Sequence, residues 1–313
     1  MSLAFVFPGQ GSQAPGMGRD LAAAFPIARE TFQEVDDALG QKLSRLIFEG
    51  PGEELTLTAN AQPALMAVSV AIARVLAKEG GFDISRQVSL VAGHSLGEYS
   101  ALTAAGSFDL GTAARLLRLR GDSMQAAVPP GEGAMAALLG AEAGQAAAIC
   151  AAAAQGEVLE VANDNGGGQV VISGAKAAVE RAVEAAKTAG IKRAMILPVS
   201  APFHCAMMEP AARVMEEALG KAAMAHPAVP VVANVTAAPV SDPDAIRGLL
   251  VRQVTGTVRW RECVAAMVAA GCTRFAEVGA GKVLTGLMKR NAPEATALAI
   301  NNPADIEAFL KSL

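Results

Sequence analysis

Residues 91–99 read Val-Ala-Gly-His-Ser-Leu-Gly-Glu-Tyr, and residues 93–97 within them match the pattern G-x-S-x-G. An apolar segment (88–92) precedes the pattern and a helical segment follows it, which predicts a sharp strand-to-helix turn. Such a turn needs small residues on both sides of the serine, because its backbone is strained and lies close to the sheet. The turn raises the serine hydroxyl above the end of the strand, where the next helix directs its free N–H groups. We therefore expect Ser95 to be a nucleophile and the Leu96 amide to be an oxyanion donor. The alternative, a plain glycine-rich turn with a capping serine, is disfavoured by the apolar strand that precedes it.

Apolar strands alternate with helices along most of the chain. Strands are expected at 3–7, 88–92, 229–235, 273–278 and 296–300, and helices at 28–39, 61–79, 96–105, 109–126, from about 206, at 244–253 and 260–270, after Gly281 and at the C-terminus. This alternation is typical of a mostly parallel sheet that helices cover on both faces. The predicted fold class is α/β, with an α/β-hydrolase-like large domain that carries the nucleophile turn.

A second unit interrupts this pattern after the sequence Val128-Pro129-Pro130-Gly131. Its expected elements are a strand at 134–139, a helix at 141–154, strands at 158–162 and 169–173, a helix at 176–189 and a strand at 193–197. The order β-α-β-β-α-β is that of a ferredoxin-like subdomain. We therefore expect this subdomain to occupy residues 128–197, inserted in a large catalytic domain made of residues 1–127 and 198–313.

Composition and charge exclude several classes of protein. A formal net charge of -4 provides no basic surface for nucleic acid or for an anionic membrane. The four cysteines form no C-x-x-C pair, which argues against a zinc site and against a disulfide framework. No basic region precedes the first apolar segment, and glycine and polar residues interrupt the alanine-rich stretch 134–154. We expect a cytoplasmic protein without nucleic-acid or membrane partners.

A nucleophilic serine needs a base, and the chain has three histidines. His94 lies inside the turn, and we expect its side chain to point away from Ser95. His226 has the sequence context of a surface residue at a helix end. His204 follows the last strand of the insert, precedes a helix and comes after the serine in chain order, as in α/β-hydrolases. His204 is therefore the best candidate for the base.

No Asp or Glu between Ser95 and His204 is evidently placed to orient this histidine. Asp122 belongs to the helix after the turn, and Asp164 belongs to the inserted segment, so neither is expected at the end of a strand of the large sheet. This absence counts against an ordinary esterase. It favours a Ser-His dyad whose histidine is held by a backbone carbonyl.

Arg120 is placed on the apolar face of a predicted helix. In Leu116-Leu117-Arg118-Leu119-Arg120-Gly121 it follows Leu117 and Leu116 by three and four residues, and so shares their side of the helix. A buried guanidinium needs an anion, and its fixed fork suits a carboxylate. From the residues alone, that carboxylate belongs either to a substrate or to an internal salt bridge.

Two glycine-rich turns do not fit nucleotide-binding patterns. The turn Gly9-Gln10-Gly11 lacks the later strand and acid of a dinucleotide site, and Gly279-Ala280-Gly281-Lys282 lacks the flanking residues of a P-loop.

These motifs together resemble the bacterial malonyl-CoA:acyl-carrier-protein transacylases over essentially the whole chain. The matching segments are Phe7-Pro8-Gly9-Gln10-Gly11-Ser12-Gln13, Gly93 to Tyr99, Arg120-Gly121, Pro202-Phe203-His204-Cys205, Gln253, and Glu277-Val278-Gly279-Ala280-Gly281-Lys282. Many relatives have Gly-Pro-Gly where this chain has Gly279-Ala280-Gly281.

The resemblance implies a role for each matching residue. Ser95 would attack the thioester of malonyl-CoA, and His204 would take its proton. Backbone N–H groups of Gln10 and Leu96 would bind the oxyanion.

Three further positions would serve the substrate and the base. Arg120 would bind the free malonyl carboxylate, and the main-chain oxygen of Gln253 would orient the histidine. Phe203 is typical of malonyl-selective relatives.

The same resemblance implies the partners and the reaction. Malonyl-CoA would acylate the serine, CoA would leave, and the thiol of holo acyl carrier protein would accept the malonyl group in fatty acid biosynthesis. No cofactor or metal would be needed, and a monomer is expected. The alternatives are a serine thioesterase or esterase, an acyltransferase that serves a polyketide synthase, and a non-catalytic acyl-binding module.

Overall fold

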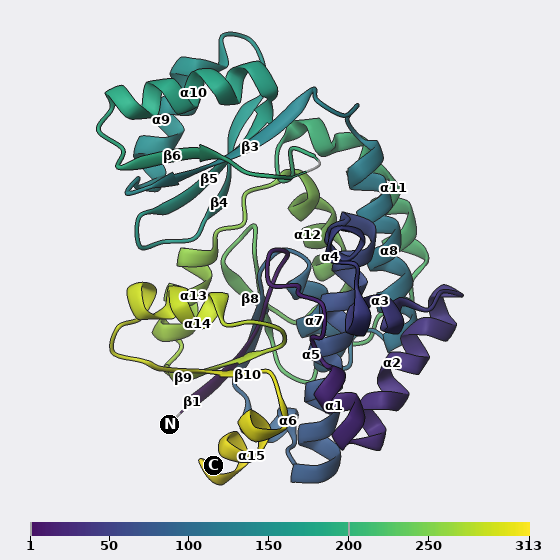
Figure 1. Ribbon diagram of the computed structural model, residues 1–313. Coiled ribbons are helices and arrows are strands. Elements are labelled where there is room, and N and C mark those ends of the chain that lie inside the picture. The colour runs from purple at the N-terminus through teal and green to yellow at the C-terminus, as the bar shows by residue number, and fades with distance from the viewer. Residues whose placement is uncertain (1, 200) are drawn as a thin grey trace.

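A six-stranded sheet forms the centre of the molecule in the computed structural model, which describes residues 2–199 and 201–313 (Figure 1). Its strands lie in the order β10 (Thr296–Ile300), β9 (Cys272–Val278), β1 (Ser2–Phe7), β2 (Leu90–Gly93), β7 (Val231–Ala233) and β8 (Ala238–Val240). All neighbouring strands are parallel except β7 and β8, which are antiparallel. The predicted α/β fold with a mostly parallel sheet is confirmed.

Strand β1 shows why both faces of this sheet are covered. Alternate side chains of a strand point to opposite faces. Leu3, Phe5 and Phe7 belong to one hydrophobic core, whereas Ala4 and Val6 belong to another. The continuous apolar run of the sequence therefore supplies two cores at once, as is usual for a central parallel strand.

Helices complete both cores. On the side of Phe5 lie α5 (Thr58–Gly80) and α7 (Gly97–Ala104), and on the other side lie α13 (Trp260–Ala269) and α14 (Val283–Asn291). The other helices outside residues 128–197 are α1 (Arg19–Ala24), α2 (Pro26–Leu39), α3 (Leu43–Glu49), α4 (Gly52–Thr56), α6 (Ile84–Gln87), α8 (Leu110–Ala126), the 3-10 turn η1 (Ala206–Met208), α11 (Glu209–Lys221), α12 (Pro243–Thr255) and α15 (Pro303–Lys311). Helix α5 is long and apolar enough to cross a membrane. However, 83% of its most apolar 18-residue segment is buried within the fold, as in a core helix.

A four-stranded antiparallel sheet lies beside the large one, at the top of Figure 1. Its order is β4 (Leu159–Asp164), β5 (Gln169–Ala175), β3 (Gly133–Leu139) and β6 (Arg193–Ile196), with α9 (Ala143–Ala154) and α10 (Lys176–Thr188) in the connections. Ala136 and Leu138 of β3 pack in the core shared with α9 and α10, whereas Met135 on the opposite face joins the core of the large sheet. One face of the small sheet is therefore turned toward the rest of the molecule.

The structure differs from the sequence prediction at the edge of the large sheet. A strand was expected over 229–235, but β7 ends at Ala233 and the chain turns back to form β8. Ala237 adopts a positive φ of 52° in this turn, and its N–H bonds to the carbonyl of Ala233. An antiparallel strand of three residues is too short to give a period-two pattern, so the sequence did not indicate it.

Candidate active site

The nucleophile turn lies at the carboxyl end of β2, and its glycines are required by close backbone contacts. Ser95 has a positive φ of 53°, the strained conformation expected of this turn. A Cβ atom at Gly93 would lie 1.9 Å from the backbone of Gly97, and a Cβ at Gly97 would lie 2.3 Å from the carbonyl oxygen of Phe7. Only glycine fits either position, because backbone atoms on both sides leave no room for a methyl group.

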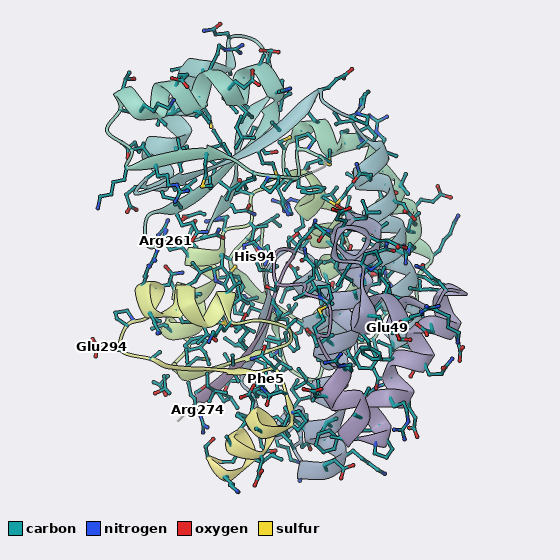
Figure 2. All side chains as sticks on the ribbon, in the orientation of Figure 1. Phe5, Glu49, His94, Arg261, Arg274 and Glu294 are labelled. Carbon is teal, nitrogen blue, oxygen red and sulfur yellow. The ribbon has the colours of Figure 1, made fainter. Side chains whose placement is uncertain are left out.

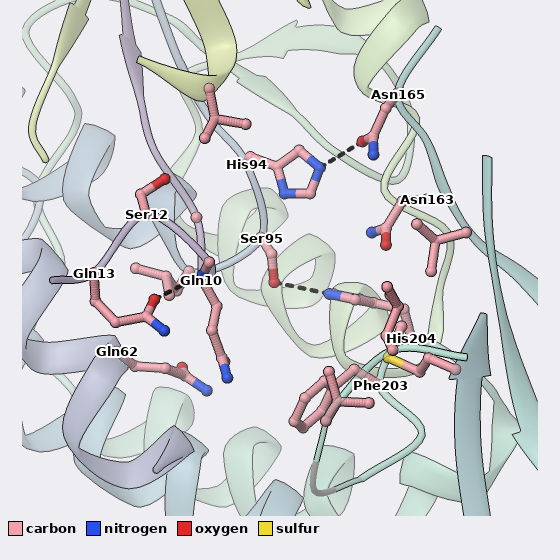
Figure 3. A pocket seen from close by; sticks show the side chains of 18 of the residues that line it. Gln10, Ser12, Gln13, Gln62, His94, Ser95, Asn163, Asn165, Phe203 and His204 are labelled. Atoms are coloured by element: carbon pink, nitrogen blue, oxygen red, sulfur yellow. Dashed lines mark hydrogen bonds between the residues drawn. The ribbon is translucent and has the colours of Figure 1, made fainter. Parts of the chain in front are cut away.

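His204 contacts the hydroxyl of Ser95 (Figure 3). The distance from Ser95 Oγ to His204 Nε2 is 2.8 Å, and His204 Nδ1 lies 2.8 Å from the carbonyl oxygen of Gln253. A carbonyl only accepts, so Nδ1 carries the proton and Nε2 is left to accept from the serine hydroxyl. The imidazole of His204 is thus oriented by a backbone carbonyl, and no carboxylate contacts its ring among residues 2–199 and 201–313.

Burial keeps this imidazole neutral. His204 is 4% exposed, and loss of solvation, followed by the positive charge of Arg120, lowers its pKa to about 3. His204 also has a positive φ of 59°, so Ser95 and His204 both have a backbone conformation that residues other than glycine rarely adopt. A neutral histidine held in one tautomer is ready to accept a proton.

Arg120 is buried beside the nucleophile without an ion pair. Its guanidinium is 1% exposed and donates to Gln62 Oε1 at 2.7 Å, to Gln253 Oε1 at 3.0 Å and to Ser95 Oγ at 3.2 Å. Its Nε atom has no hydrogen-bond partner, and no carboxylate lies within 4.0 Å of it among the described residues. Desolvation lowers the pKa of Arg120 from its ordinary value. The internal salt bridge that the sequence left open is therefore not formed there.

Two residues that line the cavity have a backbone N–H group without an acceptor among the described residues. Leu96 lies just before α7, and Gln10 lies in the loop after β1. Neither N–H has an acceptor in the part of the chain that the structure describes. Both residues line the cavity that contains Ser95, so both amides are available to a developing oxyanion.

The cavity has a volume of about 400 Å³ and lies between the two sheets. Gln10, Ser95 and His204 line its polar side, and Phe203, Met135 and Val171 contribute apolar surface. Met135 and Val171 belong to β3 and β5, so one wall comes from the four-stranded sheet.

The other two histidines lie as expected. His94 points away from the serine, and its Nε2 lies 2.8 Å from Asn165 Oδ1 in the loop after β4 (Figure 3). Figure 2 labels His94 near the middle of the view, below the four-stranded sheet. His226 is exposed. No group of three or more metal-ligating side chains occurs within residues 2–199 and 201–313.

Sequence reasoning missed three polar residues of the site. Gln62 accepts from Arg120, Glu98 accepts from Gln253, and Asn234 Oδ1 accepts from the N–H of Ser95 at 2.8 Å. Asn234 lies directly after β7, although the predicted strand 229–235 contained it, and a polar residue at the carboxyl end of a parallel strand is a signal that could have identified it. Gln62 and Glu98 lie within helical patterns, where nothing distinguished them.

Comparisons with known proteins agree with this geometry. Residues 4–302 match the acyl transferase domain family. The chain is 50% identical over 308 residues to the malonyl CoA-acyl carrier protein transacylase of Escherichia coli strain K12, and the match covers 98% of each chain. It is 55% identical to a crystal structure of acyl-carrier-protein-S-malonyltransferase from Bartonella henselae, with a TM-score of 0.98 over 100% of this chain and 99% of that one. A malonyl-transacylase solved in complex with its holo type II polyketide acyl-carrier protein is 47% identical, with a TM-score of 0.96 over 100% of both chains.

Proposed function

Since this chain belongs to the acyl transferase family, and within it to the malonyl-CoA:acyl-carrier-protein transacylases, we propose that it moves malonyl groups from malonyl-CoA to the phosphopantetheine thiol of acyl carrier protein for fatty acid synthesis. The observation that carries the proposal is Arg120. A buried guanidinium without an ion pair, 3.2 Å from the nucleophile, suits an acyl group that ends in a free carboxylate.

Acylation begins at Ser95. Its Oγ attacks the thioester carbonyl while His204 Nε2 takes the hydroxyl proton, and the N–H groups of Gln10 and Leu96 bind the oxyanion. The C–S bond then breaks, and His204 returns the proton to the leaving CoA thiolate. The product is a malonyl-serine ester.

Deacylation repeats these steps with another thiol. The phosphopantetheine thiol of the carrier gives its proton to His204 and attacks the ester carbonyl, and the bond to Ser95 Oγ breaks with return of that proton. CoA leaves before the carrier reacts, so ping-pong kinetics are expected. The main-chain oxygen of Gln253 orients the base in both halves.

The contacts of Arg120 also argue against a thioesterase. The malonyl carboxylate would bind Arg120, and Phe203 would pack along the acyl chain. An ion pair with Arg120 favours an acyl group that carries a second carboxylate, whereas the substrate of an ordinary esterase offers no anion to a buried cation. An acyltransferase that serves a polyketide carrier would use the same chemistry, and one relative was solved with a type II polyketide carrier protein.

We also propose that residues 128–197 act as an inserted subdomain of the large unit 1–127 and 198–313. Asp164 at the end of β4 pairs with Arg261 at 2.8 Å and accepts the N–H of Gly166, which holds the β4–β5 loop beside the cavity. The insert would supply one wall of the acyl site and part of the surface for the carrier. A monomer in the cytoplasm, without cofactor, nucleic acid or membrane, completes the proposal.

Intact-protein mass spectrometry tests the covalent step. Mixing the protein with malonyl-CoA should add one malonyl group, peptide mapping should assign it to Ser95, and holo acyl carrier protein should remove it. Ser95→Ala should abolish the adduct, whereas Ser12→Ala, which changes another serine lining the cavity, should retain it. An adduct mapped to Cys205, the thiol beside His204, would contradict the assignment. Comparing fatty-acid and polyketide carriers as acceptors distinguishes the two pathways.

A further inference from the structure

Glu98 is a buried acid that takes no part in the acylation and deacylation steps proposed for Ser95 and His204. It stands three residues after Ser95 in the first turn of α7 and is 1% exposed. A buried carboxylate is costly unless polar groups compensate it. The backbone N–H of Asn234 donates to its Oε2 at 3.0 Å, and the N-terminal end of α7 adds a favourable dipole. Burial still raises its pKa to about 7, so the favourable contacts compensate its charge only in part.

The second partner of Glu98 leads toward Arg120. Gln253 Nε2 donates to Glu98 Oε2 at 2.8 Å, and Gln253 Oε1 accepts from Arg120 Nη2 at 3.0 Å. Gln253 Nε2 also donates to Ser95 O at 3.1 Å and to Asn234 Oδ1 at 3.0 Å, so three acceptors, Glu98 Oε2 included, surround this amide nitrogen. The amide nitrogen must face these acceptors, so its oxygen must face the guanidinium.

The charges of Glu98 and Arg120 act on each other across this amide. The positive charge of Arg120 lowers the pKa of Glu98, and the negative charge of Glu98 raises that of Arg120, each against the larger effect of burial. Tyr99 raises the pKa of Arg120 by more than Glu98 does, but burial raises the pKa of Tyr99 to about 12, so at neutral pH its phenol carries no charge. Glu98 is therefore the carboxylate, among the described residues, that balances the buried guanidinium.

We propose that Glu98 is a positioning residue that supplies the counter-charge of Arg120 across the Gln253 amide and thereby leaves the guanidinium open to the acyl carboxylate. A carboxylate in direct contact would occupy the fork that a substrate needs. The Glu98 carboxylate, which is separated from Arg120 by the Gln253 amide, compensates the guanidinium in the empty site. When the substrate binds, it competes only weakly with the acyl carboxylate for Arg120. The proposal rests on the proposed function, in which Arg120 binds the malonyl group.

The first test is a double-mutant cycle on thermal unfolding without substrate. Glu98→Gln removes the charge, and because both partners contact Oε2, a single amide oxygen can keep both hydrogen bonds. At pH 8, above the pKa of Glu98, the ionised carboxyl costs stability, because burial raises this pKa above its ordinary value; Glu98→Gln should therefore leave the unfolding midpoint unchanged or raise it. In an Arg120→Gln background the same change should raise the midpoint by about 2–4 °C or more beyond its effect in the wild type, because the carboxylate that it removes then has no nearby cation.

A matched control is Glu277→Gln. Glu277 is equally buried, and its carboxylate accepts the N–H groups of Leu284 and Thr285 instead. Its effect should be the same in both backgrounds. Equal shifts of the midpoint by Glu98→Gln in both backgrounds would overturn the counter-charge. If Glu98→Gln alone does not fold, a folded double variant with Arg120→Gln supports the proposal, and an unfolded one overturns it.

The second test is selectivity. With the competing negative charge removed, Glu98→Gln should raise the ratio of kcat/KM for malonyl-CoA over acetyl-CoA by about threefold or more. An unchanged ratio would overturn the competition between Glu98 and the acyl carboxylate. Failure of the proposed function has a different signature: Arg120→Gln would leave the ratio unchanged although the unfolding cycle remained non-additive.

Discussion

Replacing Arg120 by Ala removes the one cation among the described residues that line the cavity. Arg120 is 1% exposed and its guanidinium donates to Gln62 and Gln253, so the positive charge is fixed inside the protein, where ions from the solvent do not reach it. A hydrogen bond that involves a charged group contributes about 1.5–3 kcal/mol. Losing it should lower kcat/KM for malonyl-CoA by roughly 10- to 150-fold, since about 1.4 kcal/mol is a factor of ten.

Acetyl-CoA supplies the internal control, because it has no carboxylate for Arg120 to bind. The assay is the ratio of kcat/KM for the two thioesters in the wild type, Arg120→Ala and Arg120→Lys, with transfer to holo acyl carrier protein as the readout. Lys should restore the ratio only in part, because a point charge lacks the geometry of the fork. Arg118→Ala is a matched control, since Arg118 donates to Asn60 and Gln41 instead. An unchanged ratio in Arg120→Ala would refute the assignment of Arg120 as the carboxylate receptor.

Three further predictions concern the base, the turn and the insert. The positive charge of Arg120 lowers the pKa of His204, so Arg120→Ala should move the acid limb of kcat/KM for acetyl-CoA to higher pH; an unmoved limb would contradict this coupling. Gly93→Ala would place a methyl group 1.9 Å from backbone and should abolish the malonyl adduct and lower the unfolding midpoint, whereas Gly248→Ala, in open space within α12, should keep the adduct and leave the midpoint unchanged or raise it. Hydrogen exchange with and without carrier protein should show protection in residues 128–197 and on the facing part of the large unit; protection confined to a remote face would count against the insert as a wall of the site.

Local patterns in the sequence were sufficient for the fold and for the nucleophile. The apolar run of β1 predicted a buried parallel strand, and its alternate residues do enter two cores. The glycines around Ser95 predicted a strained turn, because only close backbone contact requires both of them. The position of Arg120 after two leucines predicted a buried guanidinium, which is a consequence of helical periodicity alone.

The partners of these residues could not be predicted in the same way. Whether Arg120 meets a carboxylate depends on side chains that lie 58 and 133 positions away in the chain. The side chain of Gln253 joins Glu98, Ser95 and Arg120, although its own helical pattern gave no sign of such a role.

Periodicity therefore determined which face of each element is buried, because burial depends on the repeat of one helix or one strand. The tertiary structure alone decided which polar groups meet at the carboxyl ends of β1, β2 and β7. That meeting depends on how the strands are ordered in the sheet and on how the helices pack over it. The hydrogen bonds of the site join residues far apart in the chain, and no local pattern records them.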